Sequence, residues 1–140
     1  MIVFRYMNKI IIHSDGGARG NPGPAGIGAV LNASDGAVLA EISEYLGETT
    51  NNQAEYKALI AGLEKAKELK AEEVECYLDS ELVVKQLNRE YKVKNAELAP
   101  LFLKVHNLSL SFKKITFIHI RRELNKIADA LANQAMDRGL

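Results

Sequence analysis

The first third of the chain carries three β-forming segments in direct succession, and this order most restricts the possible fold. Residues 9–15, 25–33 and 37–46 are rich in Ile, Val and Leu and are bounded by turn residues. The sequence Ser-Asp-Gly at residues 34–36 predicts a tight hairpin between the second and third segments. A Gly- and Pro-rich loop at residues 20–24 joins the first two. This pattern predicts a three-stranded meander.

Helical and strand patterns alternate in the rest of the chain. Helices are expected at residues 51–70, 80–88, 95–111 and 125–138, and strands at residues 74–79 and 115–120. Ser80 can cap the second of these helices, and Pro100 is tolerable in the first turns of the third. A meander followed by such alternation predicts an α/β fold, with helices packed on a mixed sheet.

The length of 140 residues fits one domain spanning residues 1–140. We interpret residues 1–8 as an N-terminal extension outside the fold, with Met7 as an alternative start. The apolar stretch at this end is too short for a signal peptide, and no apolar run could span a bilayer. Cys76 is the single cysteine, which excludes an internal disulfide. We therefore expect a cytoplasmic protein.

Charge is distributed unevenly although the formal net charge is zero. Residues 41–81 contain eleven acidic and four basic residues, whereas residues 85–126 contain ten basic and three acidic residues. This asymmetry suggests an acidic side and a basic side of one surface. Solvated helix faces are the simpler alternative, and the charge pattern alone does not choose between them.

Three acidic residues occupy unexpected positions. Glu55 lies at the centre of the apolar stripe of the helix expected at residues 51–70. Asp15 and Asp79 each end a predicted strand, where sites in α/β sheets are commonly built. If these strands are neighbours, the two carboxylates lie side by side. The alternatives are a first-turn Glu whose head reaches water and two Asp side chains that cap turns.

The sequence pattern does not single out Asp129 as a candidate site residue in the way that it does these three acids. Asn125 is a plausible cap for the last helix, which places Asp129 in its first turn. However, Asp129 lies about 140° from Leu124 on the helical wheel, away from the apolar stripe.

Four segments together resemble the type 1 ribonuclease H family, in its archaeal or bacterial branch. They read HSDGGARGNPGPAG, TTNNQAEYKALIAGL, VECYLDSELVVKQLN and HIRRELNKIADALAN, and the resemblance extends from about residue 9 to residue 137. One such motif would be weak evidence, but four in the family's order are specific. The resemblance implies a five-stranded mixed sheet with three antiparallel strands followed by two parallel ones.

The resemblance also implies the chemistry. The four metal-binding carboxylates of the family correspond to Asp15, Glu55, Asp79 and Asp129. Oxygen ligands on open positions suit Mg²⁺, with Mn²⁺ as an alternative, and two such ions can grip a phosphate. The implied activity is hydrolysis of the RNA strand within an RNA/DNA hybrid, which leaves a 5′-phosphate and a 3′-hydroxyl.

Further positions correspond to substrate-contacting residues of the family. These are Asn21, Thr50, Asn51 and Asn52, and we expect Gly16 and Gly17 to let a nucleic acid strand approach Asp15. Helix capping is the alternative for Thr50 and Asn51, and a turn role is the alternative for Asn21. We also expect Lys92 and Lys94 to contact phosphates.

The chain departs from the family pattern at two places. The loop RRELNK lacks the catalytic histidine that many members carry there, and Arg122 is the best-placed substitute. A surface arginine is the alternative. Some members also carry a basic segment called the handle. Here it is absent, and only the segment KQLNREYKVKN occupies that region. Two rival interpretations therefore stay open: a nucleic-acid-binding domain without catalysis, and a nuclease that also cleaves double-stranded RNA. In each case we expect a monomer with no membrane partner.

Overall fold

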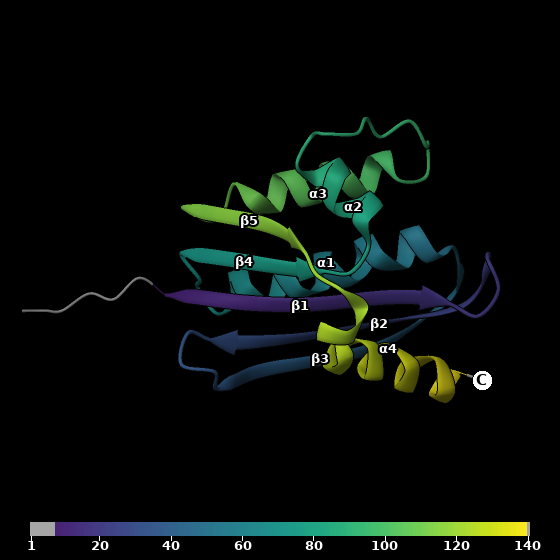
Figure 1. The fold of residues 1–140 in the computed structure, drawn as a ribbon, viewed down its shortest axis with the longest axis horizontal. Helices are drawn as coiled ribbons and strands as arrows, with labels where there is room; N and C mark the ends of the chain where they lie inside the picture. Colours follow the sequence, from purple (N-terminus) through teal and green to yellow (C-terminus); the bar gives the residue numbers. More distant parts are fainter. Residues whose placement is uncertain (1–7, 140) are drawn as a thin grey trace, which may run out of the picture.

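A five-stranded mixed sheet forms the centre of the computed structural model, which describes residues 8–139 (Figure 1). Its strands are β1 (Lys9–Ala18), β2 (Gly23–Ala33), β3 (Val38–Thr49), β4 (Glu73–Leu78) and β5 (Lys114–His119), in the order β3-β2-β1-β4-β5. The first three strands pair antiparallel, and β4 and β5 continue the sheet in parallel with β1. This arrangement confirms the α/β class and the strand pattern expected from the sequence.

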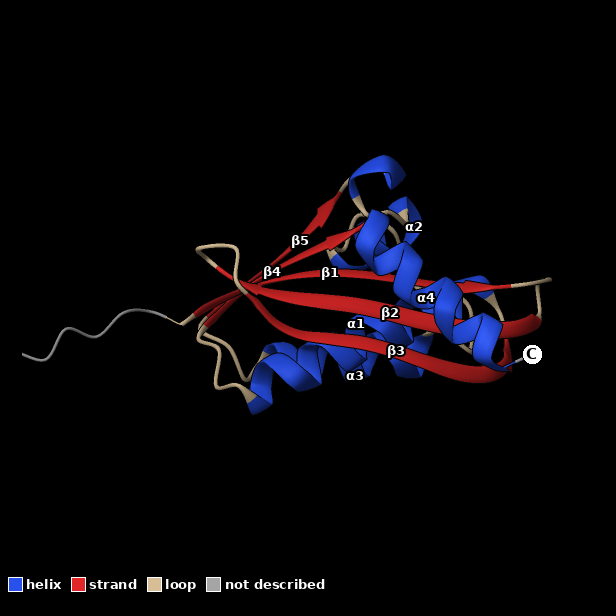
Figure 2. Cartoon of the chain, turned by 90° about the horizontal axis from the view of Figure 1, so that it is seen from below, coloured by secondary structure: helices blue, strands red, loops and turns tan. Residues whose placement is uncertain are grey.

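The helices cover the two faces of the sheet unequally. They are α1 (Asn51–Glu68), α2 (Glu81–Leu87), α3 (Ala99–Ser109) and α4 (Lys126–Gly139), with a short 3-10 helix, η1 (Arg122–Leu124), before α4. Helices α1 and α3 lie on one face, and α4 lies alone on the other, over β2 and β3 (Figure 2). The larger core therefore lies between the sheet and α1.

Alternation along β1 sends side chains to both faces. Ile10 and Ile12 are fully buried in the core beneath α1, and Leu59 and Leu63 of α1 meet them there. The opposite face is packed closely by α4: a Cβ atom on Gly28 would lie 2.2 Å from the carbonyl oxygen of Ala128. The absence of a side chain at Gly28 thus sets how closely α4 approaches the sheet.

Several predicted boundaries differ from the structure. Strand β1 continues through Asp15 to Ala18, because pairing with β2 extends to Ala18↔Ala25. Helix α3 begins at Ala99 instead of residue 95, since the Asn95 side chain accepts hydrogen bonds that close a preceding turn. Residues 1–7 of the expected extension lie outside the described residues. Asn8 belongs to the fold, because its amide donates to the Leu69 carbonyl oxygen.

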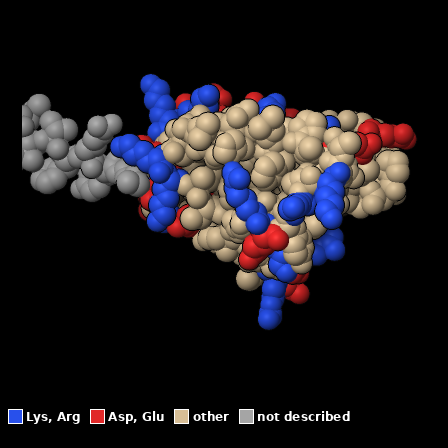
Figure 3. Space-filling model, turned by 90° about the horizontal axis from the view of Figure 1, so that it is seen from above, with Lys and Arg blue, Asp and Glu red and all other residues tan. Residues whose placement is uncertain are grey.

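The expected separation of charge is partly cancelled by strand pairing. Lys113 and Lys114 from the basic segment contact Glu72 and Glu73 from the acidic segment, where β5 lies beside β4. Figure 3 shows blue and red side chains interspersed on the face seen from above. Cys76 is a buried free thiol, and no helix among residues 8–139 is long and apolar enough to cross a membrane.

Candidate active site

The register between β1 and β4 brings Asp15 and Asp79 together. Ser14 pairs with Leu78, the last residue of β4, so the next residue of each strand lies at the same level. Strands β1 and β4 are neighbours in the sheet, which is the condition for the two carboxylates to lie side by side. Asp79 follows its strand as expected, but Asp15 lies inside β1 and is paired with Gly28 of β2. A turn-capping role is therefore excluded for Asp15.

Gly16 brings Glu55 to the same place. A Cβ atom at Gly16 would lie 2.2 Å from the carbonyl carbon and oxygen of Ala54, so only glycine lets the first turns of α1 lie against β1. Helix packing therefore requires a glycine here, and the expected approach of a nucleic acid strand stays a prediction. Gly17 faces the open cleft, where the nearest atom to an added Cβ is Met136 Cε at 3.8 Å.

Asp15, Glu55 and Asp79 form a compact carboxylate cluster. Each offers an oxygen within 4.8 Å of the oxygens of the other two. Asp15 and Glu55 are both only 8% exposed, and Glu55 Oε2 is buried without a hydrogen-bond partner. Burial, together with the charge of Asp79, raises the pKa of Asp15 to about 7. Burial and the charge of Asp15 also raise the pKa of Glu55 well above its usual value.

Asp129 lines the same cleft from the first turn of α4 but lies outside this compact cluster. Its side chain is 35% exposed, and Arg122 Nη2 lies 4.0 Å from its Oδ1. The Arg122 side chain is 82% exposed and also lines the cleft. The cation predicted to assist catalysis and the fourth predicted acid are therefore neighbours in the cleft.

Asn125 was expected to cap α4, but its side chain points into the site. Its Nδ2 donates to the Ser14 carbonyl oxygen and to Asp79 Oδ2, over 2.9 and 3.1 Å. Its Oδ1 is buried without a partner, and the residue is 1% exposed. Sequence reasoning missed this role because an Asn before a helix is an ordinary capping signal.

The acids open into a cleft of about 520 Å³. Of the predicted substrate contacts, Gly16, Gly17, Asn51 and Asn52 line it, and Arg19, Asn133 and Met136 line it without having been predicted. Thr50 and Asn21 do not line it: Thr50 caps α1, and Asn21 Oδ1 accepts from the Asn51 backbone N–H over 3.0 Å. Their contact with a substrate stays a prediction.

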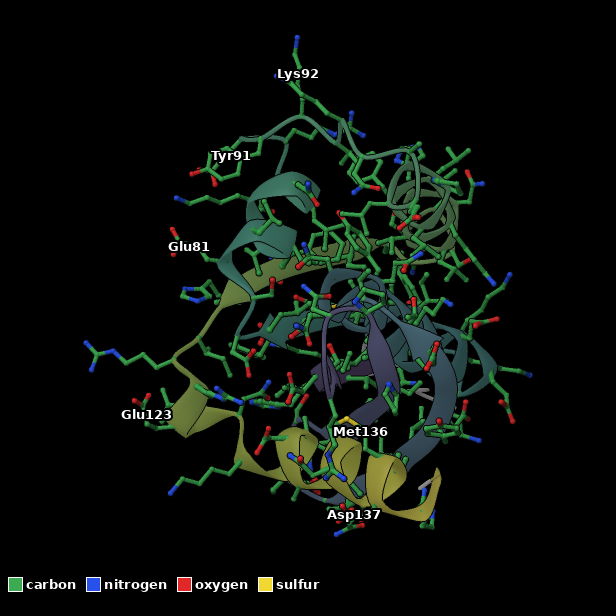
Figure 4. The ribbon with its side chains drawn as sticks, turned by 90° about the vertical axis from the view of Figure 1, so that its right-hand side faces the viewer. Glu81, Tyr91, Lys92, Glu123, Met136 and Asp137 are labelled. Carbon is green, nitrogen blue, oxygen red and sulfur yellow. The ribbon has the colours of Figure 1, made fainter. Side chains whose placement is uncertain are left out.

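The predicted phosphate-binding lysines lie elsewhere. Lys92 and Lys94 are exposed in the segment that follows α2, and neither lines the cleft. Figure 4 shows Tyr91 and Lys92 at one end of this face of the molecule, and Met136 and Asp137 on α4 at the other. Their contact with phosphates therefore stays a prediction.

Comparison with known proteins gives the family. Residues 13–135 match the model of a reverse transcriptase-like family. The chain is 35% identical to a ribonuclease H of Chlorobium phaeobacteroides over 144 residues, covering 91% of this chain and 95% of that protein. It is 47% identical over 130 residues to a bifunctional protein of Mycobacterium tuberculosis, of which it spans about a third of the length (36%).

Solved structures agree with this assignment. The fold matches RNase H1 of Halobacterium salinarum with a TM-score of 0.90 and 41% identity, covering 93% of this chain and 98% of that one. It matches LC11-RNase H1 in complex with an RNA/DNA hybrid with a TM-score of 0.89 and 47% identity, over 93% and 98% of the two chains. The fold and the acid cluster thus define a ribonuclease H-like domain. The chain belongs to the ribonuclease H family of enzymes, and the two solved relatives named above are RNase H1 proteins.

Proposed function

We propose that this protein cleaves the RNA strand of RNA/DNA hybrids internally, with Mg²⁺ or Mn²⁺ as cofactor. The observation that carries the proposal is the carboxylate cluster, whose three oxygens lie within 4.8 Å at the floor of an open cleft. The relative whose structure includes a bound RNA/DNA hybrid supports the choice of substrate. We expect a monomer to be sufficient, because every proposed contact comes from one chain.

The donor set suits a hard divalent cation. Three carboxylates that repel one another, one with a buried oxygen lacking any partner, gain most from a cation that takes oxygen ligands. Asp15, Glu55, Asp79 and Asp129 would hold it. Bound ions of this kind supply an activated water and stabilise the charge that develops on the leaving oxygen.

The other residues of the cleft orient the strand. Asn51 and Asn52 lie at the start of α1 beside the acids, where amide groups can reach the 2′-hydroxyls displayed in a wide minor groove. Asn51 Oδ1 is held by the Ala18 backbone N–H over 2.7 Å, which fixes the orientation of this side chain. Thr50 and Asn21 hold the start of α1 in place. Arg122 supplies a cation beside Asp129, and such a cation can stabilise the charge that develops on a leaving oxygen.

A cleavage assay on end-labelled RNA/DNA, RNA/RNA and DNA/DNA duplexes, each with Mg²⁺ and with Mn²⁺, tests the proposal. We expect internal cuts in the RNA of the hybrid that leave a 5′-phosphate and a 3′-hydroxyl. A hybrid with 2′-deoxy residues around one bond should resist cleavage at that bond, and Asp79→Asn provides the inactive control.

The remaining outcomes separate the alternatives. Equal cutting of duplex DNA would contradict recognition through 2′-hydroxyls. Cleavage of RNA/RNA at a comparable rate would widen the substrate class. Tight hybrid binding without cleavage would identify a binding domain instead of a nuclease.

A further inference from the structure

Arg19 is a second cation that lines the cleft, besides Arg122. It directly follows β1, and its backbone N–H donates to the Pro24 carbonyl oxygen over 2.8 Å, which anchors the start of the β1–β2 loop. Its guanidinium Nη2 lies 2.6 Å from Asp137 Oδ1 in the last turns of α4. The side chain is 38% exposed and lines the cleft.

The two cations that line the cleft each lie beside an acidic residue of α4. Arg122 lies beside Asp129, and Arg19 lies beside Asp137, eight residues further along the same helix. At 1.5 Å per residue this separation is about 12 Å along the helix axis. Asn133 and Met136 line the cleft between these two positions. Figure 4 shows Met136 and Asp137 on α4, and Glu123 apart from them on the short helix η1.

We propose that Arg19 binds a phosphate of the RNA strand, a few nucleotides away from the cleaved bond. This inference rests on the proposed function, because a strand whose phosphate reaches the acid cluster must continue along the cleft. A guanidinium carries five N–H donors in a planar fork. One contact to Asp137 leaves donors of the Arg19 guanidinium free for a phosphate oxygen.

A purely structural ion pair is the competing explanation. In that case Arg19 and Asp137 only tether the end of α4 to the β1–β2 loop, and an exposed pair of this kind contributes little. The two explanations predict different effects on hybrid binding when Asp137 is removed. A tether predicts that loss of either partner has the same effect. A phosphate site predicts opposite effects, because Asp137 competes with phosphate for Arg19 and repels the strand.

Fluorescence anisotropy with a labelled RNA/DNA hybrid provides the test, with EDTA present so that the RNA stays intact. Arg19→Ala should weaken binding roughly three- to tenfold and lower the slope of log K against log salt by about one. Arg19→Lys should keep the slope but bind less tightly than the wild type. Asp137→Asn should tighten binding, and this gain should vanish in the Arg19→Ala background.

Single uncharged methylphosphonate linkages locate the contact. The wild type should lose affinity when one particular RNA linkage is neutralised, whereas Arg19→Ala should be insensitive to that linkage. Equal affinity and salt slope for Arg19→Ala, a parallel loss in Asp137→Asn, or a site on the DNA strand would overturn the inference.

The outcomes for Arg19 and for the proposed function are distinguishable. If the wild type binds hybrid through Arg19 but does not cut it with Mg²⁺ or Mn²⁺, the proposed cleavage fails and the phosphate site stands. If it cuts hybrid and Arg19→Ala binds like the wild type, only the phosphate site fails.

Discussion

Asn125 Nδ2 donates a hydrogen bond to Asp79 Oδ2 over 3.1 Å, from a side chain that is almost fully buried. The same nitrogen donates to the Ser14 carbonyl oxygen in β1. One amide therefore links the residue after β4, the strand β1 and the start of α4. Because Asp79 belongs to the carboxylate cluster, the orientation of this acid depends on where α4 begins.

Replacing Asn125 should affect both stability and metal binding. Asn125→Ala removes both hydrogen bonds and leaves a buried carbonyl oxygen without its donor, which should cost about 2–3 kcal/mol of unfolding free energy. Mg²⁺ should also bind more weakly, because Asp79 loses its support. Chemical denaturation and titration calorimetry measure the two effects. Asn133→Ala is the matched control, since the hydrogen bond that its amide makes among residues 8–139 goes to the Asp129 carbonyl oxygen within α4. Unchanged Mg²⁺ affinity in Asn125→Ala would contradict a positioning role.

The metal-free protein should lose stability between mildly acidic and neutral pH. The pKa of Asp15 is raised to about 7 in the folded state, and that of Glu55 is also raised. An acid with a raised folded-state pKa binds its proton more tightly when folded. The contribution of such an acid to the stability of the fold is therefore greatest at low pH. It falls as pH rises above the unfolded-state pKa of about 4, and it is constant above the folded-state pKa.

Asp15→Asn should consequently melt higher than the wild type in EDTA at neutral pH, although it should not cleave. Added Mg²⁺ should stabilise the wild type by roughly 2.7 kcal/mol at a hundredfold excess over Kd, and the variant much less. Thermal melts across a pH series and a Mg²⁺ titration measure both effects. A lower Asp15→Asn melting temperature in EDTA, combined with an equal gain from Mg²⁺, would argue against a clustered metal site.

Arg122→Ala should lower kcat with little change in KM. The guanidinium lies beside Asp129 and is largely exposed, so it can assist a developing charge without supporting the fold. Steady-state kinetics on a labelled hybrid measure the change. Arg121→Ala is the neighbouring control that removes an equal charge. If both variants keep the wild-type kcat, Arg122 is a surface residue.

Gly16→Ala should unfold or severely destabilise the protein, whereas Gly17→Ala should be tolerated. The added methyl group at Gly16 would overlap the Ala54 backbone at 2.2 Å, and a backbone cannot move aside as a side chain can. At Gly17 the nearest atom is 3.8 Å away. We expect a loss of about 3 kcal/mol or more for the first variant. Melting temperatures of the two variants check the difference, and similar values would disprove the packing explanation.

Lys92→Ala combined with Lys94→Ala should weaken hybrid binding and flatten its salt dependence, with kcat at saturating substrate unchanged. Both side chains are exposed and remote from the acids, so they can contribute only electrostatic attraction. The double variant Lys67→Ala with Lys104→Ala removes the same charge from α1 and α3 and serves as the control. Equal losses in the two double variants would indicate a net-charge effect.

The amino-acid sequence by itself determined the elements, their order and the burial of one acid. Period-two and period-3.6 patterns fixed which faces of β1 and α1 are apolar, and this phase placed Glu55 in the buried stripe before any packing was known. Turn residues and capping by Thr50 and Ser80 set where α1 and α2 begin. Such features depend on neighbours a few residues apart along the chain.

The tertiary structure decided what depends on distances between elements. Asp15 is an interior strand residue because β2 pairs beyond it, and Gly16 is required because α1 lies against β1. Asn125 bonds to Asp79 across 46 residues of sequence, and Arg19 meets Asp137 across a longer separation. No local pattern encodes these contacts. They arise because burying the two faces of one sheet lays α4 against it, so that the start of α4 reaches the residue after β4 and its end reaches the residue after β1.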